Sequence, residues 1–420
     1  MLAATHYLAA EAGFRILEAG GNAIDAGVAA GIALGVVQPE FVNVAGVAPI
    51  IIYSATDNRV FTIPGLGTWP KALPRDYFKK KHGGKIPQGI LRTVVPAAPD
   101  AWISALERFG TMSFGEVAQS AIGFARDGFA VCPLMSEIIT AHEAEYRMYP
   151  SNIALYLPQG RPPQPGEVFV QKALATTLQH MADQEAAARN RGREAGLAAA
   201  RDAFYRGDIA RAIVKFQKEN GGLLSADDLA SYCSGFDEPV ETSFGDIKLY
   251  ACGPWCQGPS LLQALNLLDA AELRKLGHNS TGYLHYITEA VKLAFADREA
   301  YFGDPRMIDV PIEALLSRDY AQQRRAMIRP DRAWPEIPPA GDPRKLAAQL
   351  APQGAALVPE RAFVAPELDT SHVAVVDRHG NVFAATPSDG SYNAPVIPEL
   401  GIIPSPRAAR IGGTRTIRRG

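Results

Sequence analysis

Cysteine is scarce in this sequence, and its cysteines are not spaced as in a disulfide framework or a zinc site. The chain of 420 residues holds four of them: Cys132, Cys233, Cys252 and Cys256. No two form a C-x-x-C motif, the spacing that tetrahedral metal sites and thiol redox sites commonly use. We therefore expect reduced or inert cysteines, no metal site and no cofactor.

An excess of charge of either sign is also missing. The 42 lysines and arginines nearly balance the 44 aspartates and glutamates, which leaves a formal net charge of −2 at pH 7. Proteins that bind nucleic acid or anionic lipid usually carry a basic excess or a concentrated basic face. The sequence therefore predicts no nucleic-acid partner.

No hydrophobic run near the start of the chain reaches the length of a membrane span. The longest, 23–37, is interrupted by Asp25 and three glycines and falls short of the roughly 20 apolar residues that a bilayer requires. Met1 is followed by Leu-Ala-Ala-Thr-His, without the basic segment and apolar core of a signal peptide. We expect no membrane association and, for the sequence as it stands, a cytoplasmic protein; a periplasmic location stays open if residues precede Met1.

The sequence does contain 47% hydrophobic residues, enough for a large buried core. Apolar residues recur at helical spacing over 8–17, and the glycines that follow are typical of a helix end. Asn22 is placed to cap a second helix that runs to Val37. Short β-branched runs at 49–53 and 60–63 predict two strands. This order indicates helices packed on a sheet.

The later part of the chain combines helical segments with a proline-rich region. Alanine-rich and amphipathic patterns predict helical structure over 97–147, with a stop at Gly110, and helices over 179–206, 261–272 and 283–301. Seven prolines within 334–369 indicate an exposed linker with little beyond one short helix near 345–350. The clearest hairpin follows, with strands over 371–376 and 382–386 joined by turn-forming residues.

Thr370 lies where the linker meets the first strand of this hairpin. A threonine inside a chain is a poor nucleophile because no neighbouring base removes its proton. If cleavage made Thr370 the first residue of a chain, its own α-amine, with a pKa of roughly 8, would serve as that base. The structural alternative is a β-propensity residue at the start of a strand.

The residues around Thr370 resemble the processing site of a known enzyme family. The segment 369–381 reads Asp-Thr-Ser-His-Val-Ala-Val-Val-Asp-Arg-His-Gly-Asn and is similar to the cleavage site and first hairpin of the gamma-glutamyltransferase (gamma-glutamyltranspeptidase) family. Further segments resemble the family in the same order along the chain: 9–13, 20–26, 95–99, 108–112, 124–129, 223–229, 277–280, 292–298 and 303–305. The resemblance therefore covers nearly the whole chain.

The resemblance implies an N-terminal-nucleophile hydrolase of the α+β class, with a four-layer αββα sandwich that is incomplete at the C-terminal end. Because the family is made as a precursor that cuts itself, residues 1–369 would form the large-subunit region and 370–420 the start of the small-subunit region, paired as a heterodimer. The cut would fall between Asp369 and Thr370. Thr370 would attack first this bond and then a small-molecule amide, forming an acyl-enzyme.

Ser388 matches the family's second hydroxyl, which hydrogen-bonds the terminal threonine and orients its amine; the alternative is a plain turn serine. His372 is expected to be a packed or hydrogen-bonded structural histidine, because the terminal amine already supplies a base. The other charged candidates are expected at helix surfaces or caps, in structural ion pairs: Asp202, Asp297, Arg298 and Asp304.

The chain departs from the family at the residues that bind substrate. Leu66 stands where the family has the arginine that holds the glutamyl carboxylate, and Gly390 replaces an asparagine just past the second hydroxyl. The segment 405–409 lacks the family's glutamine and aspartate, which hold the glutamyl amino group. Arg75 is a candidate substitute for the arginine, although a solvated or capping role is favoured for it. A glutathione specialist is therefore not expected.

The end of the sequence also differs from the family. Only 51 residues follow Asp369, whereas the family's second piece is longer and supplies the glycine pair of its oxyanion hole. The arginine-rich stretch 407–420 reads as a loose tail that a change of reading frame near Pro406 would explain. Two hypotheses follow: a self-processing amide hydrolase or acyltransferase acting on a small, non-standard acyl amide, or a catalytically inactive truncated remnant or sheet-completing binding partner.

Overall fold

The computed structural model of the protein describes residues 1–348 and 370–407. Internal contacts divide the described residues into two compact units, 1–236 with 370–407 and 237–348. Both contain helices and strands. None of the helices in the described ranges is long and apolar enough to cross a membrane.

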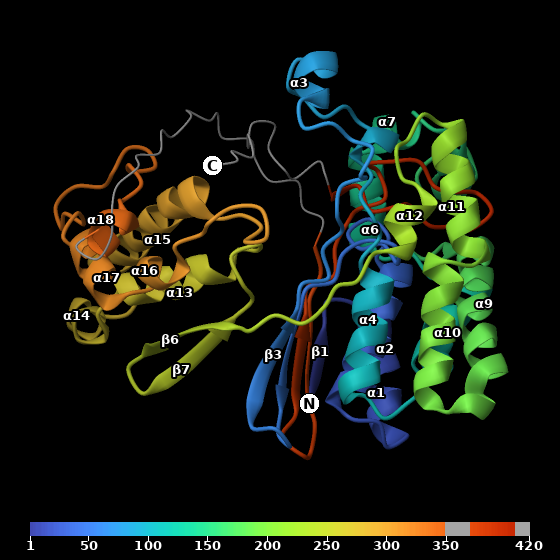
Figure 1. Ribbon diagram of the computed structural model, residues 1–420, viewed down its shortest axis with the longest axis horizontal. Helices are drawn as coiled ribbons and strands as arrows, with labels where there is room; N and C mark the ends of the chain where they lie inside the picture. The colour runs from blue at the N-terminus through green and yellow to red at the C-terminus, as the bar shows by residue number, and fades with distance from the viewer. Residues whose placement is uncertain (349–369, 408–420) are drawn as a thin grey trace. The chain divides into compact units, whose positions relative to one another are not determined.

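The first unit contains an antiparallel five-stranded sheet built from both ends of the chain. Its strands lie in the order β1 (Leu2–Ala4), β8 (Val373–Val376), β9 (Val382–Ala385), β2 (Ile50–Ser54) and β3 (Arg59–Ile63). Figure 1 shows the blue N-terminal strands and the red C-terminal hairpin in this one sheet. Both predicted hairpins are confirmed, whereas β1 was not expected. A cut before Thr370 would leave two fragments that share a sheet.

Helix α2 (Ala23–Val37) packs on one face of this sheet and is buried along its whole length. It begins after the predicted cap Asn22, whose side chain accepts hydrogen bonds from the N–H groups of Ile24 and Asp25. The approach to the sheet is close, because a Cβ on Gly27 would lie 2.1 Å from the ring of Phe383 in β9. Helix α2 therefore holds the hairpin that follows Thr370.

Helix α1 packs beside α2 and also contacts β1, and the remaining helices of the first unit lie on the side of α2 away from the sheet or near the end of the sheet (Figure 1). The bounds of the helices and short strands are α1 Tyr7–Glu18, α3 Tyr77–His82, η1 Ile90–Arg92, α4 Ala98–Phe109, α5 Phe114–Asp127, β4 Phe129–Ala130, α6 Pro133–Ala141, α7 Glu143–Tyr146, α8 Pro150–Tyr156, β5 Val168–Phe169, α9 Lys172–Ala188, η2 Arg189–Arg191, α10 Arg193–Tyr205, α11 Asp208–Glu219 and α12 Ala226–Ala230. The helical region predicted over 97–147 is a series of helices: α4 ends at the predicted stop Gly110, and β4 interrupts the region further along. The helix predicted over 179–206 is broken at Gly192, whose φ of +105° favours glycine and ends a helix.

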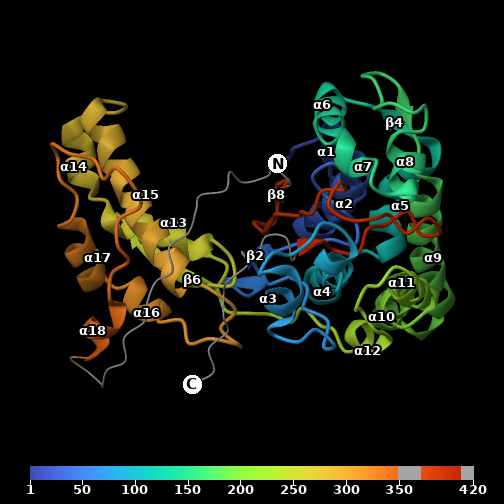
Figure 2. The same ribbon diagram turned by 90° about the horizontal axis from the view of Figure 1, so that it is seen from above.

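The second unit packs helices with a hairpin that the sequence did not reveal. Figure 2 shows α13, α15 and α17 grouped together. The bounds are β6 Val240–Phe244, β7 Ile247–Ala251, α13 Gly258–Leu267, α14 Ala270–Leu276, α15 Thr281–Tyr301, α16 Ile312–Leu315, α17 Arg318–Arg325 and α18 Pro343–Ala348. The helix predicted over 261–272 is two helices, because Asp269 caps the start of α14. The short helix predicted near 345–350 is present as far as Ala348, and 349–369 lie outside the described residues.

Candidate active site

The predicted nucleophile and the second hydroxyl lie side by side at the open end of the β8–β9 hairpin. Oγ1 of Thr370 is 2.9 Å from Oγ of Ser388. The N–H of Ser371 donates to the carbonyl of Pro387 at 3.0 Å, which continues the pairing of the two strands. Thr370 is exposed, whereas Ser388 is buried. Asp369, the other residue of the predicted cleavage site, lies outside the described residues.

The residue after Thr370 is anchored to two distant parts of the first unit. Oγ of Ser371 donates to Oε1 of Gln38 at 2.6 Å and accepts from Oγ1 of Thr5 at 2.8 Å. Gln38 ends α2, and Thr5 follows β1. The neighbouring His372 is exposed, so of the two expected structural roles, packed or hydrogen-bonded, the packed one is not met. The position of Thr370 thus depends on the assembled sheet and α2.

The residue after Ser388 has a strained backbone. Asp389 has a φ of +94°, in a region that residues other than glycine rarely adopt. Its buried carboxylate accepts a hydrogen bond from the hydroxyl of Ser405 and pairs with Nη1 of Arg407 at 3.4 Å. On the other side, a Cβ on Gly46 would lie 2.3 Å from the carbonyl oxygen of Ser388. These contacts hold the turn that presents the Ser388 hydroxyl.

Arg407 reaches the site directly. Its Nη1 donates to Oγ of Ser388 at 3.0 Å, and Oγ of Ser388 in turn lies 2.9 Å from Oγ1 of Thr370, the predicted nucleophile. The sequence interpretation placed Arg407 in a loose tail over 407–420, and for Arg407 this was wrong. Ser405, in the segment expected to lack the family's glutamine and aspartate, contacts Asp389. No local pattern marks the contact, because only the folded loop brings Arg407 to Ser388. Residues 408–420 lie outside the described part.

Leu66, at the position of the family's arginine, lies in apolar surroundings. Leu66 is half-buried and packs against the main core of the first unit. The absence of a side chain at Gly390 has a steric explanation, because a Cβ there would lie 2.5 Å from the carbonyl oxygen of Glu40. Arg75 is exposed in the segment before α3.

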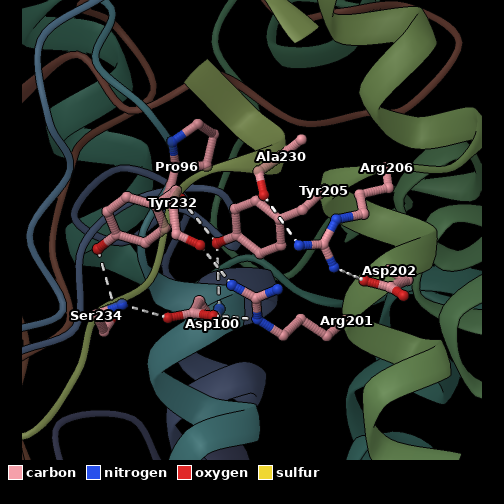
Figure 3. Close-up of polar contacts among 9 residues, drawn as sticks. All are labelled: Pro96, Asp100, Arg201, Asp202, Tyr205, Arg206, Ala230, Tyr232 and Ser234. Carbon is pink, nitrogen blue, oxygen red and sulfur yellow. Dashed lines mark hydrogen bonds and ion pairs between the residues drawn. The ribbon is translucent and has the colours of Figure 1, made fainter. Parts of the chain in front are cut away.

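A buried polar network holds the loop that carries Leu66, and Figure 3 shows its members Asp100, Arg201, Tyr232 and Ser234. The hydroxyl of Tyr232 donates to the carbonyl of Leu66 at 2.8 Å. Tyr232 in turn accepts a hydrogen bond at its own carbonyl from Arg201 of α10, which forms an ion pair with Asp100 of α4. Asp100 is fully buried and also accepts from the N–H of Ser234 at 2.6 Å. This network ties the loop to two helices.

Glu40 is a buried carboxyl beneath the turn of Ser388, and no sequence pattern singled it out. It is fully buried, and neither of its carboxyl oxygens hydrogen-bonds another residue in the described part of the chain. The N–H of Ser391 donates to the carbonyl of Pro39 at 3.1 Å, which holds this segment against the turn. Burial raises the pKa of Glu40 to about 8. The group is therefore mostly protonated at neutral pH.

The chemistry that this arrangement offers is attack by a hydroxyl. Thr370 supplies an exposed oxygen, Ser388 an adjacent hydroxyl, and Arg407 a positive charge that favours negative charge developing on either oxygen. Across 1–348 and 370–407, no group of three or more histidines, cysteines or carboxylates is arranged to hold a metal ion.

Known proteins are similar to this chain in sequence and in fold. The family model described as gamma-glutamyltranspeptidase matches residues 9–407. The Acylase ACY 1 proenzyme of Pseudomonas sp. (strain SE83) is 34% identical over 96% of this chain and 68% of its own length. The Glutathione hydrolase proenzyme of Escherichia coli (strain K12) is 31% identical over 92% of this chain and 62% of its own. The crystal structure of cephalosporin acylase from Bacillus halodurans has a TM-score of 0.82 and 26% identity, covering 99% of this chain and 70% of that one.

The chain belongs to the gamma-glutamyltranspeptidase family, a family of amide-cleaving and acyl-transferring enzymes. It spans about two thirds of the length of the two curated relatives, 68% and 62%.

Proposed function

We propose that this chain is a self-processing amide hydrolase or acyltransferase, with Thr370 as nucleophile, acting on a small amide whose acyl part is not a standard glutamyl group. The observation that carries the proposal is the contact of 2.9 Å between the hydroxyls of Thr370 and Ser388. The similarity to relatives named as acylase and hydrolase proenzymes supports it.

The proposed first step is cleavage before Thr370. Oγ1 of Thr370 attacks the carbonyl carbon of Asp369, the C–N bond breaks, and the nitrogen takes up a proton as it becomes the α-amine of Thr370. An ester then joins Asp369 to Oγ1, and water hydrolyses it to a free carboxylate and a free hydroxyl. Ser388 hydrogen-bonds Oγ1, and Arg407 holds Ser388 in place.

The processed chain would use the same oxygen on its substrate. The new α-amine of Thr370 takes the proton from Oγ1 as this oxygen attacks the amide carbonyl, and the amine of the substrate leaves with that proton. Water or an acceptor amine then takes the acyl group from Oγ1, which restores the hydroxyl. No cofactor enters either step.

The substrate class rests on the surroundings of the site. Leu66 offers no cation for a glutamyl carboxylate, and the space beside Gly390 is filled by the backbone of Glu40. Leaving a carboxylate without a paired cation costs several kcal/mol in desolvation. An acyl group without that carboxylate carries no such penalty, in line with the name of the acylase relative.

The proposal includes a four-layer αββα sandwich. The face of the sheet that turns away from α2 carries apolar side chains that are only partly buried: Ile51, Tyr53, Ala374, Val382 and Ala384. A second sheet packed on this face would cover them. We also propose that the cleaved fragments stay together as a heterodimer, because they share the first sheet.

Mass spectrometry of the purified chain tests the proposal. We expect two fragments, one with Thr370 at its N-terminus, and a single uncleaved chain for Thr370→Ala because alanine lacks the attacking oxygen. The exposed Thr386, sixteen residues further along the same hairpin, provides the matched control Thr386→Ala, which should cleave normally. Cleavage of Thr370→Ala at the same bond and rate would refute the nucleophile. A single 45.1 kDa chain after long incubation would instead support an inactive remnant or binding partner.

A further inference from the structure

Two cysteines of the second unit meet at the junction of β7 and α13. Cys252 follows β7, and Cys256 lies two residues before α13. The segment between them folds back, because the N–H of Cys256 donates to the carbonyl of Gly253 at 3.1 Å. The first residue of α13 packs on Cys252: a Cβ on Gly258 would lie 2.9 Å from the Cys252 carbonyl oxygen. The two thiols consequently hydrogen-bond each other.

The surroundings of the two sulfur atoms differ. Sγ of Cys256 accepts a hydrogen bond from the N–H of Gly258 at 3.3 Å, at the start of α13. The hydrogen bond from Cys252 is the larger influence that lowers the pKa of Cys256, with the Gly258 N–H adding to it, and the same thiol contact together with burial raises the pKa of Cys252. The deprotonated form is therefore favoured more at Cys256 than at Cys252.

Charged groups flank the pair. The carboxylate of Asp237 accepts a hydrogen bond from Nε1 of Trp255 at 2.9 Å, and its negative charge also disfavours a thiolate at Cys252. Arg298 of α15 donates to Oε1 of Gln257, next to Cys256, at 2.5 Å. Both sulfur residues are partly accessible to solvent. The geometry is that of an attacking and a resolving thiol.

We propose that Cys252 and Cys256 form a reversible thiol–disulfide exchange site that reacts with low-molecular-weight disulfides. The thiolate of Cys256 attacks one sulfur of the small disulfide, whose S–S bond breaks and releases one small thiol. Cys252 then loses its proton and attacks Sγ of Cys256 in the mixed disulfide, which releases the second small thiol and leaves an internal disulfide. Two protein thiols are oxidised, and one small disulfide is reduced to two thiols.

This inference departs from the expectation of inert cysteines, which rested on the absent C-x-x-C spacing. Three residues separate Cys252 from Cys256, and the turn at Gly253 is what brings the sulfurs together. The inference is independent of the chemistry proposed for Thr370, which lies in the other unit.

Cys233 supplies an internal control, because it is more exposed than either member of the pair. The reduced full chain is incubated with oxidised glutathione, the remaining thiols are alkylated at intervals, and the peptides are mapped. We expect Cys256 to react at least tenfold faster than Cys233, and the product to be an internal Cys252–Cys256 disulfide that dithiothreitol reverses. Faster reaction at Cys233, or disulfides between chains, would overturn the proposal.

Two serine variants separate the roles of the thiols. Cys252→Ser should accumulate a stable mixed disulfide at Cys256, because no resolving thiol remains. Cys256→Ser should slow the reaction at Cys252 at least tenfold. Absence of the mixed disulfide in a Cys252→Ser chain with native circular dichroism would contradict the assignment, and the comparison of Cys256 with Cys233 in the unaltered chain tests it if either variant fails to fold.

Discussion

Glu40 in the first unit and Asp297 in the second are both fully buried carboxyl groups, yet their surroundings are opposite. Asp297 faces Arg324 at 3.2 Å and accepts hydrogen bonds from the Gly341 N–H at 2.8 Å and the Tyr320 hydroxyl at 3.0 Å. Glu40 has no hydrogen bond to another residue within the described ranges. The comparison shows that the second unit uses its buried charge to hold helices together. The first unit places a neutral acid under the turn that carries Ser388.

The largest effect is expected from removing the paired charge. Asp297→Ala would leave the buried guanidinium of Arg324 without its partner, which typically costs about 3–5 kcal/mol. Asp202 forms a half-exposed pair with Arg206, so Asp202→Ala should cost no more than about 0.5 kcal/mol. Urea unfolding of both variants measures the difference. Equal losses would show that the buried pair is not structural.

The buried carboxyl of Glu40 should make the free energy of unfolding depend on pH. Because burial raises the pKa of Glu40 from 4.5 to about 8, the folded chain holds this proton more tightly than the unfolded chain. Its contribution to stability is complete below pH 4.5 and is lost as the pH rises towards 8, by about 3 kcal/mol at pH 7. Glu40→Gln removes this dependence.

The measurement is the free energy of unfolding of Glu40→Gln and the unaltered chain between pH 4 and pH 8. Burial lowers the pKa of His6 in the same unit, an effect of opposite sign that cancels in the difference between the two proteins. The difference should grow in favour of Glu40→Gln as the pH rises. Parallel pH curves would mean that Glu40 is paired and charged.

The next effect concerns the rate of cleavage. Arg407→Ala removes a charged hydrogen bond to Ser388, worth about 1.5–3 kcal/mol, so self-cleavage should slow roughly 10- to 100-fold. Arg378, exposed in the turn of the same hairpin, gives the control Arg378→Ala, which should cleave at the normal rate. The half-time of fragment formation measures both. An unchanged half-time for Arg407→Ala would show that Arg407 does not contribute to self-cleavage.

The smallest effect is expected from restoring one family residue. Leu66→Arg should leave turnover of γ-glutamyl anilides by the processed protein low, because the backbone of Glu40 still fills the space beside Gly390. Kinetics on a panel of acyl anilides measures it. A clear preference of the unaltered protein for the γ-glutamyl member would overturn the proposed substrate class.

The sequence was informative where the determining contacts are local. Asn22 and Asp25 are three residues apart and form the predicted cap of α2. The turn residues between β8 and β9 specified their hairpin, and the order of motifs along the chain indicated the family. For Asp297 the expected structural ion pair is present, with Arg324, but the expected place at a helix surface was wrong. A single buried aspartate on α15 has no sequence signature beyond the helix itself.

What the sequence determined by itself is the set of helices and hairpins with strong caps and turns, the family, and the identity of Thr370 as a candidate nucleophile. Only the tertiary structure decided that β1 pairs with β8, that Arg407 reaches Ser388, that Glu40 is buried without a hydrogen bond to another of the described residues, and that Cys252 meets Cys256. The physical reason is the distance along the chain over which each kind of interaction acts. Caps and turns act over a few residues, whereas a buried charge or a long-range pair owes its energy to whichever segments the completed fold places around it.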